Sequence, residues 1–181
     1  GAQNMLTGFL IYFQGLGESF SSTMKYIKSI PTKELIEQIV ADTNEKAKME
    51  IMQFCGMDDK TLSGVFAELS NHITVFATSD DLQRALSGEG RSITPADIEG
   101  GYDIFCCIPK YKLDEWKALL GMMCNQFLKS FERRAEGNTT PILFLIDEVP
   151  RLEKIEAISN GLATLHSKKI HIFFTITLSD Y

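Results

Sequence analysis

The chain has 181 residues, enough for one ordinary domain or one and a half small ones, and 44% of them are hydrophobic. This hydrophobic content supplies a buried core and excludes an intrinsically disordered chain. A net charge of −6 excludes a protein that binds nucleic acid through whole-chain positive charge. No apolar run approaches the ~20 residues that span a bilayer, and the apolar stretch Met5–Phe13 lacks the basic flank of a signal peptide. We therefore expect a soluble protein that is not exported.

The four cysteines and three histidines lack the spacing of metal ligands. No Cys-x-x-Cys pair occurs, and Cys106 and Cys107 are adjacent, which suits neither a zinc knuckle nor a stable disulfide. We expect reduced thiols in a cytosolic protein and no structural metal.

Apolar residues in the first ninety positions recur at helical spacing. Thr32 is a candidate N-cap for a short helix, a second helix is expected near Glu45–Cys55, and Ser79 starts another. The clearest stripe has apolar residues three or four apart over about four turns: Leu62, Val65, Phe66, Leu69, Ile73 and Phe76. Residues 1–90 carry 7 basic and 12 acidic side chains, a net charge of −5, so this helical module is a poor binder of phosphate backbone by itself.

From Thr94 onward the pattern changes to apolar runs that alternate with helices. The predicted strands are Tyr102–Ile108, Ile142–Ile146 and Ile170–Ile176. The helix after the first strand has an apolar stripe of Leu113, Trp116, Leu120, Met123, Phe127 and Phe131, and another helix spans about 152–166. Continuously apolar strands that alternate with helices indicate a parallel sheet covered on both faces. The predicted fold class is therefore α/β with an all-helical module, in which a helical bundle precedes a strand-helix-strand-helix-strand unit.

One candidate site lies at the end of the second predicted strand, where Asp147 and Glu148 follow Ile142–Ile146. Ligands bind at the carboxyl edge of parallel sheets. In a P-loop NTPase this is the Walker B position, where the first carboxylate serves the Mg²⁺ shell beside the nucleotide and the second polarises the attacking water. Any strand that leaves a core can also end in acidic residues, so an ordinary strand end stays an alternative.

No phosphate-binding loop of the form Gly-x-x-x-x-Gly-Lys-Ser/Thr occurs in the 181 residues. The segment Gly88–Ser92 has two glycines but lacks both the lysine and a preceding strand. A phosphate cradle needs successive backbone N–H groups and the lysine ammonium. We therefore expect ATP and Mg²⁺ to bind a longer parent protein, and neither to bind this chain tightly or be hydrolysed by it alone.

From residue 60 onward the chain resembles the type IV secretion coupling proteins (TraG/TraD-type conjugation ATPases). The most specific segment is Phe144–Leu152, which is similar to a Walker B strand followed by a short apolar turn. Further similar segments are Met5–Tyr12, Phe76–Leu86 and Ile98–Pro109. Residues 18–57 match the family by helical character only.

The resemblance implies a RecA-like motor with an all-helical domain inserted between the P-loop and the Walker B strand. It places the all-α domain at residues 1–99, with 1–17 alternatively a motor-domain helix, and the C-terminal part of the motor at 100–181. The chain begins at a glycine without an initiator methionine, so we expect an excised fragment. The resemblance implies that the P-loop and a membrane anchor lie upstream of Gly1. By the same resemblance Asp147 binds nucleotide-associated Mg²⁺ through water and Glu148 is the catalytic, water-activating carboxylate.

Two positions depart from the family pattern. The family usually carries Arg-Gly-x-Gly-Ile before its next strand, where this chain has His166-Ser-Lys-Lys-Ile170. An arginine that acts across the ring then has no equivalent unless Lys168 or Lys169 replaces it, and lysine is a poor bidentate phosphate clamp. The family also ends that strand with a glutamine near the γ-phosphate, where Thr177 is this chain's candidate sensor.

The resemblance implies a homo-hexamer at the cytoplasmic face of the bacterial inner membrane. Such rings deliver a relaxase or other secreted protein, and single-stranded DNA, to the type IV secretion channel, with the helical domain engaging the substrate. Two alternatives stay open. One is a soluble RecA-like DNA translocase, and the other is a non-enzymatic docking module whose acidic helices bind a basic protein partner.

Overall fold

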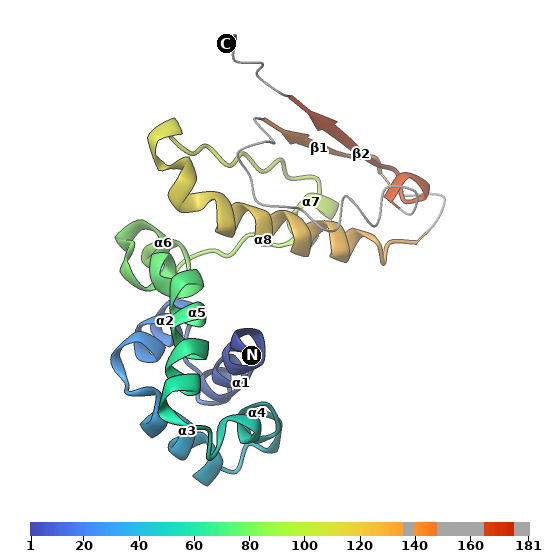
Figure 1. The fold of residues 1–181 in the computed structure, drawn as a ribbon. Helices are drawn as coiled ribbons and strands as arrows, with labels where there is room; N and C mark the ends of the chain where they lie inside the picture. Colours follow the sequence, from blue (N-terminus) through green and yellow to red (C-terminus); the bar gives the residue numbers. More distant parts are fainter. Residues whose placement is uncertain (136–139, 148–164, 176–181) are drawn as a thin grey trace. The chain divides into compact units, whose positions relative to one another are not determined.

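The computed structural model describes residues 1–135, 140–147 and 165–175, and the chain divides into two compact units, residues 1–92 and 93–181. The helices of the first unit are α1 (Ala2–Gly15), α2 (Phe20–Ser29), α3 (Thr32–Ala41), α4 (Glu45–Ile51), α5 (Asp59–Thr78) and α6 (Asp80–Ala85), with a 3₁₀ turn at Met52–Phe54 (Figure 1). The second unit contains α7 (Pro95–Glu99), a 3₁₀ turn at Lys110–Lys112, α8 (Leu113–Phe131), β1 (Ile142–Ile146) and β2 (Ile170–Phe174).

Side-chain caps define where most helices of the first unit begin. The capping side chains, each of which accepts a hydrogen bond from a backbone N–H three residues further on, are Ser19, Asn44, Asp58 and Ser79. The predicted cap at Thr32 is wrong by one residue. Pro31 occupies the N-cap and makes no side-chain bond, because Thr32 is already the first helical residue of α3.

The core of the first unit forms where α1 packs against α4, α5 and α2. The predicted stripe on α5 is confirmed in Leu62, Leu69, Ile73 and Phe76, which are buried, while its other two members are half-buried. Gly8 of α1 lies directly against Ile51 of α4, and a Cβ atom at Gly8 would lie 2.6 Å from Ile51 Cδ1 and Cγ1. The absent side chain therefore sets the close approach of α1 to α4.

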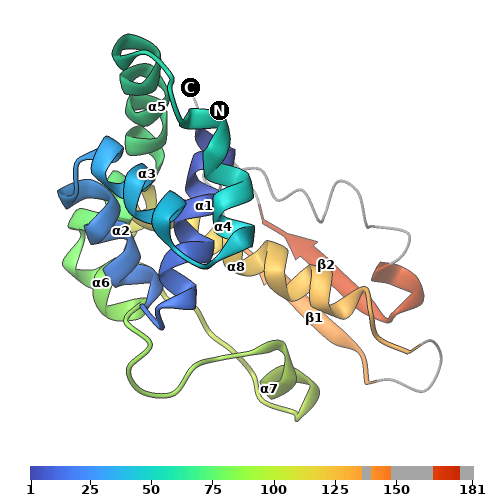
Figure 2. The ribbon, with the colours of Figure 1, turned by 90° about the horizontal axis from the view of Figure 1, so that it is seen from below.

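The second unit is built on two parallel strands covered by one long helix (Figure 2). The pairing runs in register from Ile142 opposite Ile170 to Ile146 opposite Phe174. Alternate residues of both strands point toward α8 because successive strand side chains project to opposite faces. The buried cluster between the sheet and α8 contains Phe127, Leu128, Phe131, Ile142, Ile146, Leu165 and Ile170.

The prediction for the sheet is confirmed in part. Two of the three expected strands form, and the described residues are mostly helical with a two-stranded parallel sheet. Tyr102–Ile108 is not a strand: it forms no ladder with another strand among the described residues, and Phe105 is 84% exposed although Ile104 packs on the cluster. High β propensity alone does not make a strand, since a strand needs a ladder partner.

The expectation of a sheet covered on both faces is not confirmed among the described residues. Leu143, Leu145 and Phe173, on the face opposite α8, are 61%, 68% and 63% exposed. The predicted helix 152–166 lies outside the described residues except for its last turn. Among the helices that the structure does describe, none combines the length and apolar character needed to cross a membrane.

Candidate functional site

Asp147 lies at the carboxyl edge of the two-stranded sheet, directly after β1. The register of the two strands continues by one residue beyond their ends, which places Thr175 opposite Asp147. The Thr175 backbone N–H donates to the Ile146 carbonyl oxygen at 3.0 Å, and its hydroxyl donates to Asp147 Oδ1. An exposed carboxylate and a hydroxyl from neighbouring strands therefore meet at this edge.

The chemistry of this pair suits a hard cation. Carboxylate and hydroxyl oxygens are the ligand types that Mg²⁺ prefers, directly or through its retained waters. A carboxylate has about four acceptor positions, so the bond from Thr175 leaves Asp147 able to accept from a metal-bound water. The hydroxyl also fixes the orientation of the carboxylate, as a supporting hydrogen bond does for metal ligands in general.

Of the three site residues that the sequence predicts, only Asp147 is within the described structure. Glu148 and Thr177 lie outside the described residues. Sequence reasoning missed Thr175 and selected the threonine two positions later. The signal was present: β1 and β2 are apolar runs of five residues, and aligning their first residues pairs Asp147 with Thr175.

A second set of contacts lies at the opposite, amino edge of the sheet, around the buried Arg134. Its Nη1 donates to the Lys168 carbonyl oxygen at 3.0 Å, and its Nη2 donates to the Thr140 carbonyl oxygen at 2.7 Å. Glu99 of α7 completes the set, with Oε1 2.6 Å from Arg134 Nε and Oε2 2.9 Å from Nη2. One side chain thus joins α7 to the segments that lead into both strands.

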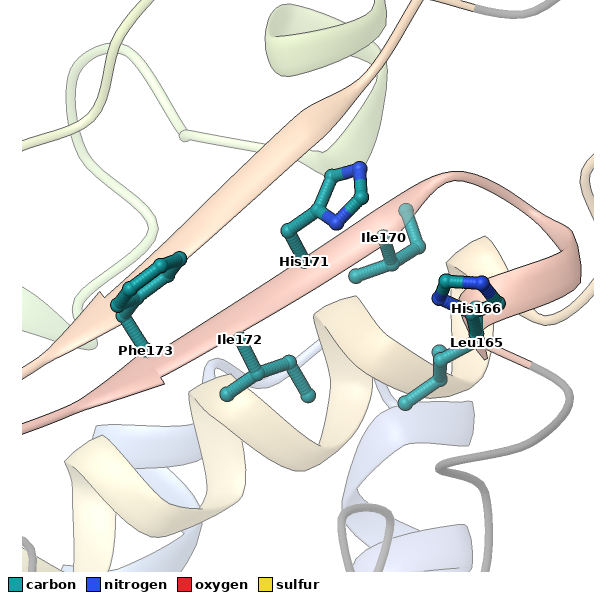
Figure 3. Close-up of a pocket in the computed structure, with 6 residues that line it drawn as sticks. All are labelled: Leu165, His166, Ile170, His171, Ile172 and Phe173. Carbon is teal, nitrogen blue, oxygen red and sulfur yellow. The ribbon is translucent and has the colours of Figure 1, made fainter.

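A helical turn followed by two lysines, Lys168 and Lys169, precedes β2. Lys169 has a φ of 57°, a left-handed conformation that glycine adopts most easily. It stands where the family resemblance has the glycine before isoleucine, which explains that pattern. The His166 and His171 rings lie edge-to-face with centroids 6.2 Å apart. They border a shallow pocket of about 230 Å³ whose lining is Leu165, His166, Ile170, His171, Ile172 and Phe173 (Figure 3).

The first unit has a groove of its own, of about 440 Å³, between the start of α3 and one side of α5. Its lining residues are Pro31, Thr32, Lys33, Asp59, Leu62, Ser63, Phe66, Ala67 and Ser70. An ion pair between Lys33 and Asp59 spans it. Nearby, Lys28 Nζ lies 2.6 Å from the Ser70 hydroxyl, so polar groups surround an apolar floor.

The cysteines do not form a reactive site in the described residues. All four are free, and Cys124 is half-buried. Burial raises the pKa of both Cys106 and Cys124, which lowers the fraction of the nucleophilic thiolate. No group of three or more potential metal ligands occurs among residues 1–135, 140–147 and 165–175.

Comparison with known proteins identifies the family of the chain. The family model described as "Type IV secretory system Conjugative DNA transfer" matches residues 17–177, which covers most of both units. Searches of curated proteins and of solved structures found no match. Because this match covers well over half of the 181 residues, the chain belongs to the type IV secretory conjugative DNA-transfer family.

Proposed function

We propose that this chain is part of a coupling ATPase for conjugative DNA transfer, in which Asp147 serves the Mg²⁺ shell of bound ATP. The observation that carries the proposal is the pairing of Asp147 with Thr175 at the carboxyl edge of adjacent parallel strands. This edge is where α/β proteins bind ligands. Thr175 orients the Asp147 carboxylate, a role separate from the sensor role that the sequence suggested for Thr177.

In this proposal the second unit belongs to a RecA-like motor and the first unit is its inserted helical domain. Residues 1–181 contain no P-loop, so the nucleotide site is completed by a P-loop in another part of the full-length protein. Glu148 activates the water that attacks the γ-phosphate. The assembled protein is a homo-hexameric ring at the cytoplasmic face of the inner membrane, and it passes a relaxase or other protein and single-stranded DNA to the secretion channel.

The test uses the full-length protein and measures ATP hydrolysis against Mg²⁺ concentration. Glu148→Gln should abolish turnover and leave nucleotide binding intact. Asp147→Asn should raise the Mg²⁺ concentration needed for activity. Thr175→Val should lower activity or metal affinity about 10–100-fold, the usual effect of removing a hydrogen bond that orients a ligand. Thr61→Val, on the exposed start of α5, is the matched control and should leave turnover unchanged.

Unchanged turnover in both Asp147→Asn and Glu148→Gln would refute the motor assignment. Asp147 and Glu148 would then be ordinary acidic residues at the end of a strand, without a role in ATP hydrolysis.

A non-enzymatic docking function has one specific observation in its favour. The groove between α3 and α5 combines an apolar floor with polar and charged rims, and the helical module around it carries net negative charge. Such a surface suits a basic protein segment better than bare DNA. Binding of a basic peptide that survives Glu148→Gln and is lost on Phe66→Ala, a groove-lining change, would support this function independently of ATP hydrolysis.

A further inference from the structure

Helix α7 is a short helix that is closed at both ends by its own residues. The Thr94 backbone N–H donates to Asp97 Oδ2 at 2.7 Å, and the Thr94 hydroxyl donates to the same oxygen at 2.9 Å. At the other end, the N–H groups of Gly101 and Tyr102 donate to the Ile98 and Asp97 carbonyl oxygens. Bonds of this kind fix the first and last turns of helices. Helix α7 therefore docks on the rest of the second unit as one body.

Two side chains dock α7 on the second unit. Ile98 packs against the buried cluster between the sheet and α8, and Glu99 contacts Arg134. No residue of α7 is itself fully buried, so the apolar area that Ile98 contributes is limited. The contact between Glu99 and Arg134 therefore makes a substantial contribution to the docking of α7.

Glu99 supplies the countercharge for a buried cation. The Arg134 side chain is 5% exposed, and that of Glu99 is 39% exposed. Among the described residues, Glu99 is the one carboxylate that Arg134 contacts; its other neighbours are two carbonyl oxygens and the Phe131 ring. A buried charge that loses its counterion is strongly disfavoured, because neutral groups do not replace the lost hydration. Without Glu99, Arg134 should therefore turn toward solvent and release both carbonyl oxygens.

Arg134 connects α7 to both strands. Its bonds to the Thr140 and Lys168 carbonyl oxygens hold the segments that lead into β1 and β2. When these starting points loosen, the pairing loosens along the whole ladder, since one register applies to all of its residues. The hydroxyl of Thr175 reaches Asp147 one residue beyond the last pair of that ladder. The orientation of the Asp147 carboxylate thus depends on contacts at the opposite edge of the sheet.

We propose that Glu99 is a positioning residue for ATP hydrolysis. Through Arg134 it keeps β1 and β2 in the register that sets the Thr175 hydroxyl on the Asp147 carboxylate. Docking of α7 is then a condition for an ordered Mg²⁺ site, although Glu99 itself touches neither the metal nor the nucleotide. This role rests on the proposed function, in which Asp147 serves the Mg²⁺ shell.

The first measurement is hydrogen exchange by NMR in the 181-residue chain, which needs no nucleotide. It follows the N–H of Ile142, which donates to the Lys169 carbonyl oxygen at the start of the ladder, and the N–H of Thr175 at its end. Glu99→Gln should accelerate exchange about tenfold at both positions, because the unpaired buried charge loosens the start of both strands. Faster exchange at Ile142 alone would overturn the proposal, since Glu99 would then support only the amino edge.

The second measurement is ATP turnover of the full-length protein against Mg²⁺ concentration. Glu99→Gln should raise the Mg²⁺ concentration at half-maximal turnover about three- to tenfold, less than Thr175→Val, because it acts through a further residue. The kcat at saturating Mg²⁺ should stay close to that of the parent protein, since Glu148 is untouched. Glu99→Asp keeps the charge on a shorter side chain and should recover part of the loss.

Two controls separate positioning from charge and from folding. Asp103→Asn removes one negative charge from an exposed residue just after α7, and it should leave both readouts unchanged. Leu128→Ala removes a buried side chain from the cluster under the sheet, so it should lower the melting temperature. At temperatures where it is folded, Leu128→Ala should not raise the Mg²⁺ requirement. An equal rise in Leu128→Ala and Glu99→Gln would show that Glu99 acts only through stability.

Parental exchange rates or a parental Mg²⁺ requirement in Glu99→Gln would also overturn the role of Glu99. The two proposals can fail separately. If Asp147→Asn leaves turnover unchanged, the proposed function fails, while the exchange data still test the connection from Glu99 to Thr175. If Asp147→Asn raises the Mg²⁺ requirement and Glu99→Gln does not, only the role of Glu99 fails.

Discussion

Replacing Gly8 with alanine tests whether the close packing of α1 on α4 organises the helical unit. The new Cβ atom would lie 2.6 Å from both Ile51 Cδ1 and Cγ1 and 3.2 Å from Glu50 Cβ. Ile51 is fully buried, so it has little room to move. Overpacking of this kind costs about 1–3 kcal/mol. Alanine recovers about 1 kcal/mol of helix propensity, so the net loss of unfolding free energy should be up to about 2 kcal/mol.

The matched control is Gly64→Ala in α5. A Cβ atom at Gly64 meets nothing within 4 Å, so only the propensity term acts and the unit should gain about 1 kcal/mol. Urea unfolding followed by circular dichroism measures both variants.

A second background, Ile51→Ala, removes both atoms that crowd position 8. On it, Gly8→Ala should become neutral or stabilising, so the double-mutant cycle should show coupling of about 1–3 kcal/mol. Equal stabilisation by Gly8→Ala and Gly64→Ala in the parent protein would refute the steric account of the α1–α4 approach.

Three further predictions follow from other single residues. Lys169→Gly should raise the free energy of unfolding by about 1 kcal/mol, because the left-handed backbone costs a lysine about that much. Denaturant titration measures this change, and a loss of stability would mean that the lysine side chain supports the turn before β2. Arg134→Ala should lower the free energy of unfolding of the second unit by about 3 kcal/mol, because the Glu99 carboxylate and two backbone carbonyls lose their hydrogen-bond donor. Arg134→Lys should recover only part of this loss, as measured by thermal melts. Hydrogen bonds from the Thr61 side chain and backbone lower the pKa of Asp58, so its cap stabilises α5 above the unfolded pKa of about 3.9 and loses that effect as the pH falls through the lower folded value. The difference in melting temperature between the parent protein and Asp58→Ala should therefore shrink on acidification below about pH 4, and a constant difference would contradict the capping role.

The helical unit was largely predictable because its signals are local. The stripe from Leu62 to Phe76 places one face of α5 in the core, and Ser79 caps α6 as expected. Each of these features depends on residues within a few turns of one another. The contact between Gly8 and Ile51 was not predictable, since it joins helices whose crossing no local pattern specifies.

The strands were predictable only where an apolar run also has a neighbouring strand to pair with. The run Ile142–Ile146 is a strand, but Tyr102–Ile108, with equally strong β formers, pairs with no strand in the described part of the chain and is irregular there. The Walker-like position of Asp147 could be read from the run that precedes it. Its partner Thr175 follows only if the first residues of the two runs are aligned, and no local pattern specifies that register between segments far apart in the chain.

Arg134 helps to set that register, and through it the pairing of Asp147 with Thr175. It bonds the carbonyl oxygens of Thr140 and Lys168, which lie two residues before the first residue of β1 and of β2 respectively. Anchoring equivalent positions of two parallel strands fixes their starting points, and five residues later Asp147 meets Thr175. A slip of one residue would turn the apolar face of one strand away from α8 and remove the hydroxyl from Asp147. Arg134→Ala in the full-length protein should therefore lower ATP turnover toward the level of Thr175→Val, even at temperatures where circular dichroism shows the variant folded. Full turnover in the folded Arg134→Ala protein would show that the buried cluster alone sets the register.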